Sequence, residues 1–340
     1  MPGAVSPPSS ALVAAAEYHG VIAELRRAYG LYTDDGRTRE LRATALAARG
    51  IALRATCAAV DVSTWLRDAG IAHAVVKGPA LARFYPESDR TFVDLDVLVH
   101  AEHMSAAIAA LVGHGCTLVD GMSWPRADGV GEISVALQSG VTLDLHADLI
   151  HRPDVRRCFW FPARKLLGRT SQMEILGRQV PVLDREDTLI HVALHAVISG
   201  GDRLIWLADL DRLVASGEVR WEIVVERAQE AGLALVVGVM LCRASITLGT
   251  EVPDEALATL LRGGRVWSQL LIGFDRMRPV SRSYGRLFRG QILVRATRQG
   301  TLSSLVALTR LVVSGVIRPL LTEADHPWRR ALARHDVHRR

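Results

Sequence analysis

The order of apolar and polar positions divides the chain into helical ends and a central block of strands. From Ala11 to Gly70 the apolar residues recur at helical spacing, and alanine, leucine and arginine dominate. At Ile71 short apolar runs begin, which are typical of buried strands. From Glu186 onward the spacing is helical again. This order predicts an α+β protein with a small mixed sheet, flanking helices and a helical C-terminal region.

Short apolar runs predict the individual strands of the central block. Two of them flank Gln138-Ser139-Gly140, which is typical of a tight hairpin turn, and a further hairpin is expected about Gly177-Arg178. Strands are predicted over Ile71–Val76, Leu95–Val99, Ile133–Leu137 and Val141–Leu145, with a helix over Met104–Gly113. Farther along, helices are predicted over Asp187–Val197, Leu204–Ala215 and Trp221–Ala231, followed by an apolar stretch to Leu248.

A chain of 340 residues is long enough for two domains. The patterns predict a disordered N-terminus over residues 1–10, N-terminal helices over 11–70, an α/β core over 71–185 and a helical domain with a basic tail over 186–340. Hydrophobic residues make up 49% of the chain and charged residues 23%, which excludes a disordered, collagen-like or disulfide-rich class.

Several features of the sequence favour a cytoplasmic protein. The four cysteines show no paired spacing and are expected to be reduced. The N-terminus lacks the basic region of a signal peptide. The apolar stretch Thr301–Leu321 carries Arg310 at its middle, and a charge there costs about 3 kcal/mol in a bilayer. We therefore expect a buried or amphipathic helix at this stretch and no transmembrane segment.

The basic residues are unevenly chosen and unevenly placed. Of 41 basic residues only Lys77 and Lys165 are lysines. Residues 262–340 hold 16 arginines and four acidic residues. Such a basic third can attract a polyanion such as tRNA, a membrane surface or a nucleotide, and it can equally be a solvated arginine surface.

The candidate chemistry begins with two aspartates on one predicted strand. Asp94 and Asp96 are two residues apart, so both point to the same face of the sheet. Two neighbouring carboxylates repel unless a cation lies between them, and Mg²⁺ prefers carboxylate oxygen. Asp144 lies on another predicted strand; if the two strands pair, three carboxylates converge on two metal ions. The alternative is a surface strand that carries solvated acids.

A possible phosphate-binding turn precedes these aspartates. Lys77 and Gly78 end the first predicted strand and open a helix, where backbone N–H groups and an ammonium can meet phosphate. Arg90 stands four residues before Asp94 and can reach the same pocket.

The histidines leave several interpretations open. His146 shares a strand face with Asp144 and can hydrogen-bond a metal-bound carboxylate or the substrate. His191 and His195 lie one helical turn apart, where they can be packing residues, contact the substrate, or bind zinc together with Asp209.

The combined arrangement resembles the polymerase-beta-like nucleotidyltransferase superfamily, which has a glycine turn, an Asp-hydrophobic-Asp strand and a later strand aspartate. Over residues 71–215 it is similar to the bacterial "nucleotidyltransferase family 5" group. One departure from the superfamily is Gly78-Pro79, where Gly-Ser is common. The likeness is carried by Lys77-Gly78, Leu81, Tyr85-Pro86, Arg90, Asp94–Val99, Asp144–His146, His191, His195 and Trp206–Leu210.

The resemblance implies a nucleotidyltransferase-type sheet and a Mg²⁺-dependent transfer of a nucleoside monophosphate from an NTP, with ATP expected, to an acceptor hydroxyl. Asp94, Asp96 and Asp144 would be the catalytic ligands of two Mg²⁺ ions, while Lys77, Gly78, Arg90 and His146 would bind the nucleotide. A small-molecule acceptor is expected. The alternatives are transfer to tRNA or a protein, with RNA bound by the basic C-terminal third, and a non-catalytic nucleotide-binding subunit.

Overall fold

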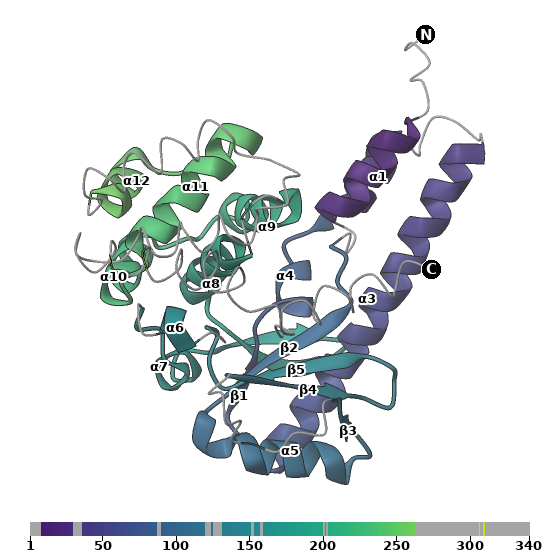
Figure 1. Ribbon diagram of the computed structural model, residues 1–340, viewed down its shortest axis with the longest axis vertical. Helices are drawn as coiled ribbons and strands as arrows, with labels where there is room; N and C mark the ends of the chain where they lie inside the picture. Colours follow the sequence, from purple (N-terminus) through teal and green to yellow (C-terminus); the bar gives the residue numbers. More distant parts are fainter. Residues whose placement is uncertain are drawn as a thin grey trace.

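The structure is a computed structural model, and Figure 1 shows it as a ribbon. It describes residues 8–29, 36–86, 90–119, 124, 131–150, 153–156, 159–199, 201, 203–262, 306 and 309. The basic C-terminal third and the stretch Thr301–Leu321 therefore lie almost entirely outside the described residues. So does the predicted disordered N-terminus up to residue 7.

Helices open and close the described chain, and strands occupy its middle. The N-terminal helices are α1 (Ser10–His19), α2 (Ile22–Tyr29) and α3 (Gly36–Asp68). Between the strands lie α4 (Pro79–Ala82), the short 3₁₀ helix η2 (Ala101–His103), α5 (Met104–Gly113), α6 (Pro153–Arg156) and α7 (Ala163–Leu167). The C-terminal helices are α8 (Arg185–Ile198), α9 (Leu204–Ala215), α10 (Trp221–Glu230), α11 (Ala234–Leu248) and α12 (Asp254–Leu261).

Seven described strands form one mixed sheet in the order β3-β4-β5-β2-β1-β7-β6. Strand β2 pairs in parallel with β5 and antiparallel with β1, and β1 in turn pairs in parallel with β7. The strands are β1 (His73–Val75), β2 (Asp94–Val99), β3 (Thr117–Leu118), β4 (Glu132–Ala136), β5 (Thr142–His146), β6 (Ser171–Ile175) and β7 (Arg178–Val182).

The two faces of the sheet belong to different hydrophobic cores. Leu95 and Val97 of β2 are fully buried in a core that includes residues of α3 and α5. Leu98, on the opposite face of β2, belongs to a second core formed with α8–α11. The helices α8–α12 gather beside the sheet as a separate layer (Figure 1). Toward the start of β2 this second face carries polar residues instead. Two of them, Asp94 of β2 and Asp144 of β5, are only partly buried.

Helix α3 is the longest described element, with 33 residues. Its stretch Arg42–Asp68 is long and apolar enough to cross a membrane by length and composition alone, although the core helix of a soluble protein meets the same criteria. Ala55, Val62 and Leu66 of this stretch are fully buried in the core beneath the sheet. Only 28% of the apolar part of this stretch is buried, and Leu46 and Leu53 are exposed.

The α+β class, the mixed sheet and the helical C-terminal region are confirmed. The hairpin about Gln138-Ser139-Gly140 joins β4 to β5, and the hairpin about Gly177 joins β6 to β7. The two-residue strand β3 and helix α12 were not predicted, because both are short and carry little periodicity. The described cysteines, Cys57, Cys116 and Cys242, are free thiols.

Candidate active site

The register between β2 and β5 brings the three predicted aspartates to one face of the sheet. Asp96 lies directly opposite Asp144, and Asp94 lies opposite Thr142. Their apolar neighbours Leu95 and Leu143 point to the other face, where burial fixes the orientation of both strands. The charge of Asp96 acts on both Asp94 and Asp144, and the charge of Asp144 acts on Asp94. The sequence-predicted carboxylates thus form one cluster.

Asp96 is the centre of this cluster. Its Oδ1 lies 2.7 Å from Lys77 Nζ and 3.0 Å from His146 Nε2. Only 5% of the Asp96 side chain is exposed, so water screens these contacts weakly. Burial opposes ionisation of Asp96, but Lys77 and His146 outweigh it and hold the pKa of Asp96 well below its usual range. Asp96 is therefore ionised at neutral pH.

In the other two carboxyl groups, Asp94 and Asp144, neighbouring groups do not offset the effect of burial on the pKa. Burial raises the pKa of the Asp94 carboxyl, and the neighbouring charge of Asp96 raises it further. Burial also raises the pKa of Asp144, against which a hydrogen bond from Ser134 Oγ to Asp144 Oδ1, 2.7 Å long, acts in the opposite direction. The cluster carries more negative charge than Lys77 alone can neutralise.

Strand β4 adds two polar residues that the sequence analysis did not single out. Ser134 lies opposite Asp144, and Glu132 lies opposite His146 with its Oε2 3.4 Å from His146 Nδ1. Both alternate with the buried residues Ile133 and Val135. The period-two pattern of this hairpin strand, joined to the strand of Asp144, was the signal that would have placed them on the site face.

The turn after β1 holds Lys77 beside the carboxylates. Gly78 has φ 52° and ψ −111°, and a Cβ at this position would lie 3.1 Å from the ring of Phe92 and 3.5 Å from the carbonyl oxygen of Asp94. Glycine is therefore required for the conformation and for the close approach to β2. Helix α4 is a single turn, and Ala80 N already donates to the carbonyl oxygen of Lys77. The turn thus offers fewer N–H groups than a full helix would.

Arg90 is bound mainly to a residue of the helical layer. Its Nε lies 2.6 Å from Asp209 Oδ1, and its Nη2 lies 2.9 Å from Asp209 Oδ2. Tyr85 Oη donates to the same Oδ1 over 2.8 Å. Burial opposes the charge of Arg90, but Asp209 outweighs it and raises the pKa of Arg90. Two of the three guanidinium nitrogens are thus bonded to Asp209.

His191 of α8 borders the site from the helical layer. Its side chain is buried, and the backbone carbonyl of Val76 accepts a hydrogen bond from it. Burial, together with the charge of Lys77, lowers the pKa of His191 to about 3, so the imidazole is neutral. Within the described residues its Nδ1 has no hydrogen-bond partner. His191 therefore has an uncharged, unpaired nitrogen, and the charge of Lys77 acts on its ring.

The structure does not support a zinc site at His191, His195 and Asp209. The carboxylate of Asp209 accepts three hydrogen bonds from Arg90 and Tyr85. The rings of His191 and His195 are 6.3 Å apart, and His195 packs against Trp206 at 6.0 Å. Among the described residues, no group of three His, Cys, Asp or Glu side chains is arranged so that it holds a metal ion.

The chemistry of the carboxylate cluster nevertheless fits a hard divalent cation. Three carboxylates share one face, and the pKa values of Asp94 and Asp144 are raised partly because the charge of Asp96 is close by. A cation relieves this repulsion, and carboxylate oxygen is the ligand that Mg²⁺ prefers. In the present arrangement the ammonium of Lys77 takes the place of that cation at Asp96.

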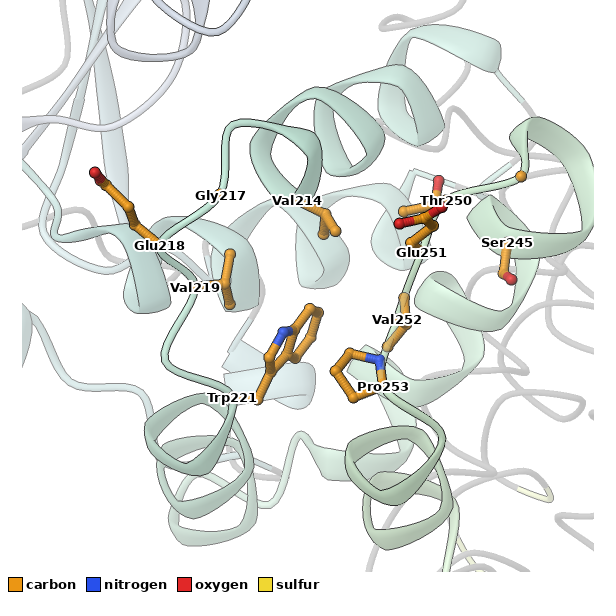
Figure 2. A pocket seen from close by; sticks show the side chains of 11 residues that line it. Val214, Gly217, Glu218, Val219, Trp221, Ser245, Thr250, Glu251, Val252 and Pro253 are labelled. Atoms are coloured by element: carbon orange, nitrogen blue, oxygen red, sulfur yellow. The ribbon is translucent and has the colours of Figure 1, made fainter.

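Two hollows lie outside this cluster. One, of about 600 Å³, lies within the helical layer, where Trp221 and Pro253 point into it (Figure 2). The other, of about 640 Å³, lies between α3, α4 and the β6–β7 turn and includes Phe92 and Arg83. None of the three carboxylates lines either hollow.

The mixed sheet, its flanking helices and an Asp-Leu-Asp strand beside a third aspartate define a protein of the nucleotidyltransferase class. A family model described as "Uncharacterised nucleotidyltransferase" matches residues 8–249. The chain therefore belongs to this family, and its general activity is nucleotidyl transfer.

Other comparisons add less. A search of curated proteins gave no match. A solved structure of an antigenic nucleotidyltransferase-like protein from Paracoccidioides brasiliensis is similar, with 13% sequence identity and a TM-score of 0.38. That similarity covers 62% of this chain and 92% of the other.

Proposed function

We propose that this protein is a Mg²⁺-dependent nucleotidyltransferase that moves a nucleoside monophosphate from an NTP, with ATP expected, to a hydroxyl group of a small molecule. The observation that supports this most is the parallel register that sets Asp96 beside Asp144, with Asp94 on the same face and Lys77 bonded to Asp96. Family membership supports the general reaction.

The phosphates of the NTP lie over the turn of Lys77 and Gly78. The absence of a side chain at Gly78 permits close approach, and the ammonium of Lys77 neutralises phosphate charge. Nη1 of Arg90 adds a second cationic contact, held in place by Asp209. Stabilising the charge on the transferring group is where most catalysis in such reactions originates.

Asp94, Asp96 and Asp144 would hold two Mg²⁺ ions, which supply charge neutralisation and a template for the phosphates. The acceptor oxygen attacks the α-phosphorus in line, and pyrophosphate leaves. Asp144 receives the proton of the acceptor hydroxyl, and the hydrogen bond from Ser134 holds the orientation of its Oδ1. His146 holds the orientation of Asp96 through its Nε2 contact.

The distribution of charge along the chain supports a small-molecule acceptor. Residues 1–261 carry the acidic excess of the chain, and an acidic surface attracts an aminated small molecule. An RNA acceptor would instead use the basic residues 262–340. These two acceptors predict different responses to salt, since affinity for RNA falls steeply as salt rises.

The test is calorimetric titration of the full chain with ATP and, in parallel, the other NTPs, each with and without Mg²⁺. We expect binding that requires Mg²⁺ and is lost in Asp96→Ala, while Asp68→Ala, at an exposed residue at the end of α3, binds as the wild type does. Equal binding by Asp96→Ala would remove the carboxylate cluster from the nucleotide site. Binding of tRNA that weakens steeply with salt would replace the small-molecule acceptor by RNA.

A further inference from the structure

The carboxylate cluster contains its own cation, because Lys77 forms an ion pair with Asp96. Lys77 Nζ lies 2.7 Å from Asp96 Oδ1, and the two side chains are 20% and 5% exposed. Solvent and salt therefore screen this pair less than a surface pair. Burial opposes the charge of Lys77, yet Asp96, with Asp94 and Asp144 behind it, raises the pKa of Lys77, so it stays an ammonium.

A divalent cation at the cluster competes with this ammonium. Asp96 Oδ1 already receives Lys77 and His146 Nε2. A metal ion arriving at Asp96 meets a positive charge at hydrogen-bond distance from the same oxygen, and like charges repel. The cation at the centre of the cluster can therefore be Lys77 or a metal ion, but the two oppose each other.

We consider two further partners for the ammonium of Lys77 once it leaves Asp96. His191 Nδ1 is buried and has no hydrogen-bond partner among the described residues. Because the neutral ring donates its other N–H to the carbonyl of Val76, Nδ1 carries a lone pair that can accept from an ammonium. Lys77 also directly precedes the Gly78 turn, so phosphates over that turn would lie within its reach.

We propose that Lys77 is an internal counter-cation that keeps free divalent metal ions out of the carboxylate cluster, and that the phosphates of a bound NTP draw it away from Asp96. This inference rests on the proposed function and adds the order in which nucleotide and metal bind. Nucleotide opens the cluster to metal, and by linkage metal strengthens the binding of nucleotide. Lys77 then has two roles: without nucleotide it is the counter-cation of Asp96, and with nucleotide it contacts the phosphates.

The first test measures Mn²⁺, a paramagnetic substitute for Mg²⁺, by the loss of its free electron paramagnetic resonance signal, without nucleotide. Lys77→Met removes the charge and keeps an unbranched side chain. We expect it to bind Mn²⁺ on the order of tenfold more tightly than the wild type. Lys165→Met is the matched control, because Lys165 is the other lysine of the chain and pairs with Glu230 at the surface. It should leave Mn²⁺ affinity unchanged. Equal Mn²⁺ affinity in Lys77→Met and the wild type would overturn the proposal.

The second test uses the wild type, and so does not depend on the folding of a variant. The chain has two lysines, so ¹³C labelling of lysine Cε gives two signals, which Lys165→Met assigns. We expect inorganic triphosphate without metal to shift the Lys77 signal, and Mg²⁺ alone at the same concentration to leave it in place. A Lys77 signal that moves with Mg²⁺ alone and ignores triphosphate contradicts the proposal.

These results separate the proposal from the function on which it rests. If NTP and Mg²⁺ bind together at Asp96 while Lys77→Met leaves the affinity for Mn²⁺ unchanged, only the counter-cation role fails. If neither NTP nor Mn²⁺ binds the wild type, alone or together, the proposed function fails as well.

Discussion

Two buried aspartates, Asp96 and Asp209, each face a basic side chain but differ in how completely their charge is matched. Asp209 accepts two hydrogen bonds from Arg90 and one from Tyr85, so both its oxygens are occupied. Asp96 meets Lys77 and His146 on one oxygen. Two further carboxylates on the same face add negative charge around Asp96.

This difference separates a structural connection from a reactive site. A planar guanidinium matches a carboxylate bidentately, and the result is a rigid link between the loop before β2 and helix α9. A single ammonium shared by clustered carboxylates leaves negative charge for a ligand to neutralise. The two centres should therefore respond differently to loss of the carboxylate charge, one mainly in activity and the other mainly in stability.

The largest effect is expected from Asp96→Asn. This change removes a ligand charge without changing the volume, so turnover of labelled NTP should fall by at least about a hundredfold, the scale seen when one charge-stabilising group is lost. Circular dichroism should show that the variant remains folded. Asp68→Asn, at the exposed end of α3, is the control and should keep full turnover. Wild-type turnover by Asp96→Asn would mean that the reaction takes place elsewhere.

Asp209→Asn should act mainly on stability. Arg90 would remain buried, with 9% of its side chain exposed, and would lose its charge partner. Breaking such a pair costs about 3 kcal/mol or more. Urea unfolding measures this loss. Asp211→Asn is the control: Asp211 accepts one hydrogen bond from Thr250, which the amide oxygen of asparagine can still accept, so this variant should lose less than about 1 kcal/mol. Equal losses in the two variants would contradict the role of Asp209 as the link.

Lys77→Arg should weaken NTP binding by roughly tenfold and slow transfer, with little change in Tm, because the larger planar guanidinium replaces a compact ammonium. Nearly every other basic residue of the chain is arginine, so a purely solvated Lys77 would accept arginine freely. Lys165→Arg provides the matched control. If Lys77→Arg binds NTP as tightly as the wild type does, only the positive charge at this position matters and not the compact shape of the ammonium.

The smallest effect is expected from Ser134→Ala. It removes the hydrogen bond to Asp144 Oδ1, which is worth about 1 kcal/mol, or roughly a fivefold loss in kcat/KM. Ser245→Ala, at the hollow of the helical layer, is the control. A loss as large as that of Asp96→Asn would give Ser134 a direct part in the chemistry.

The sequence was enough to predict the strand-borne part of the site. Alternation in β2 fixes the common face of Asp94 and Asp96, and the short hairpin turn at Gln138-Ser139-Gly140 limits how the strand of Asp144 can pair. Both are local rules, because neighbouring residues and a two-residue period decide them. The helices α8–α11 followed from apolar periodicity in the same way.

The pairing of Arg90 with Asp209 could not be predicted. These residues are 119 positions apart, and only the packing of α9 beside the loop before β2 brings them together. Arg90 was therefore expected at the phosphates, and Asp209 was considered as a zinc ligand. The contact of Lys77 with Asp96 depends on tertiary structure too, since it needs the pairing of β1 with β2 and the Gly78 turn.

We propose that Asp94, Asp96 and Asp144 together form the metal and nucleotide site. Crystals grown with Mn²⁺ and α,β-methylene ATP, measured at the manganese absorption edge, test it most directly. We expect an anomalous peak in contact with Asp96 and with Asp94 or Asp144, with the triphosphate over Lys77 and Gly78. A bound analogue whose manganese peak touches none of the three carboxylates would contradict the claim.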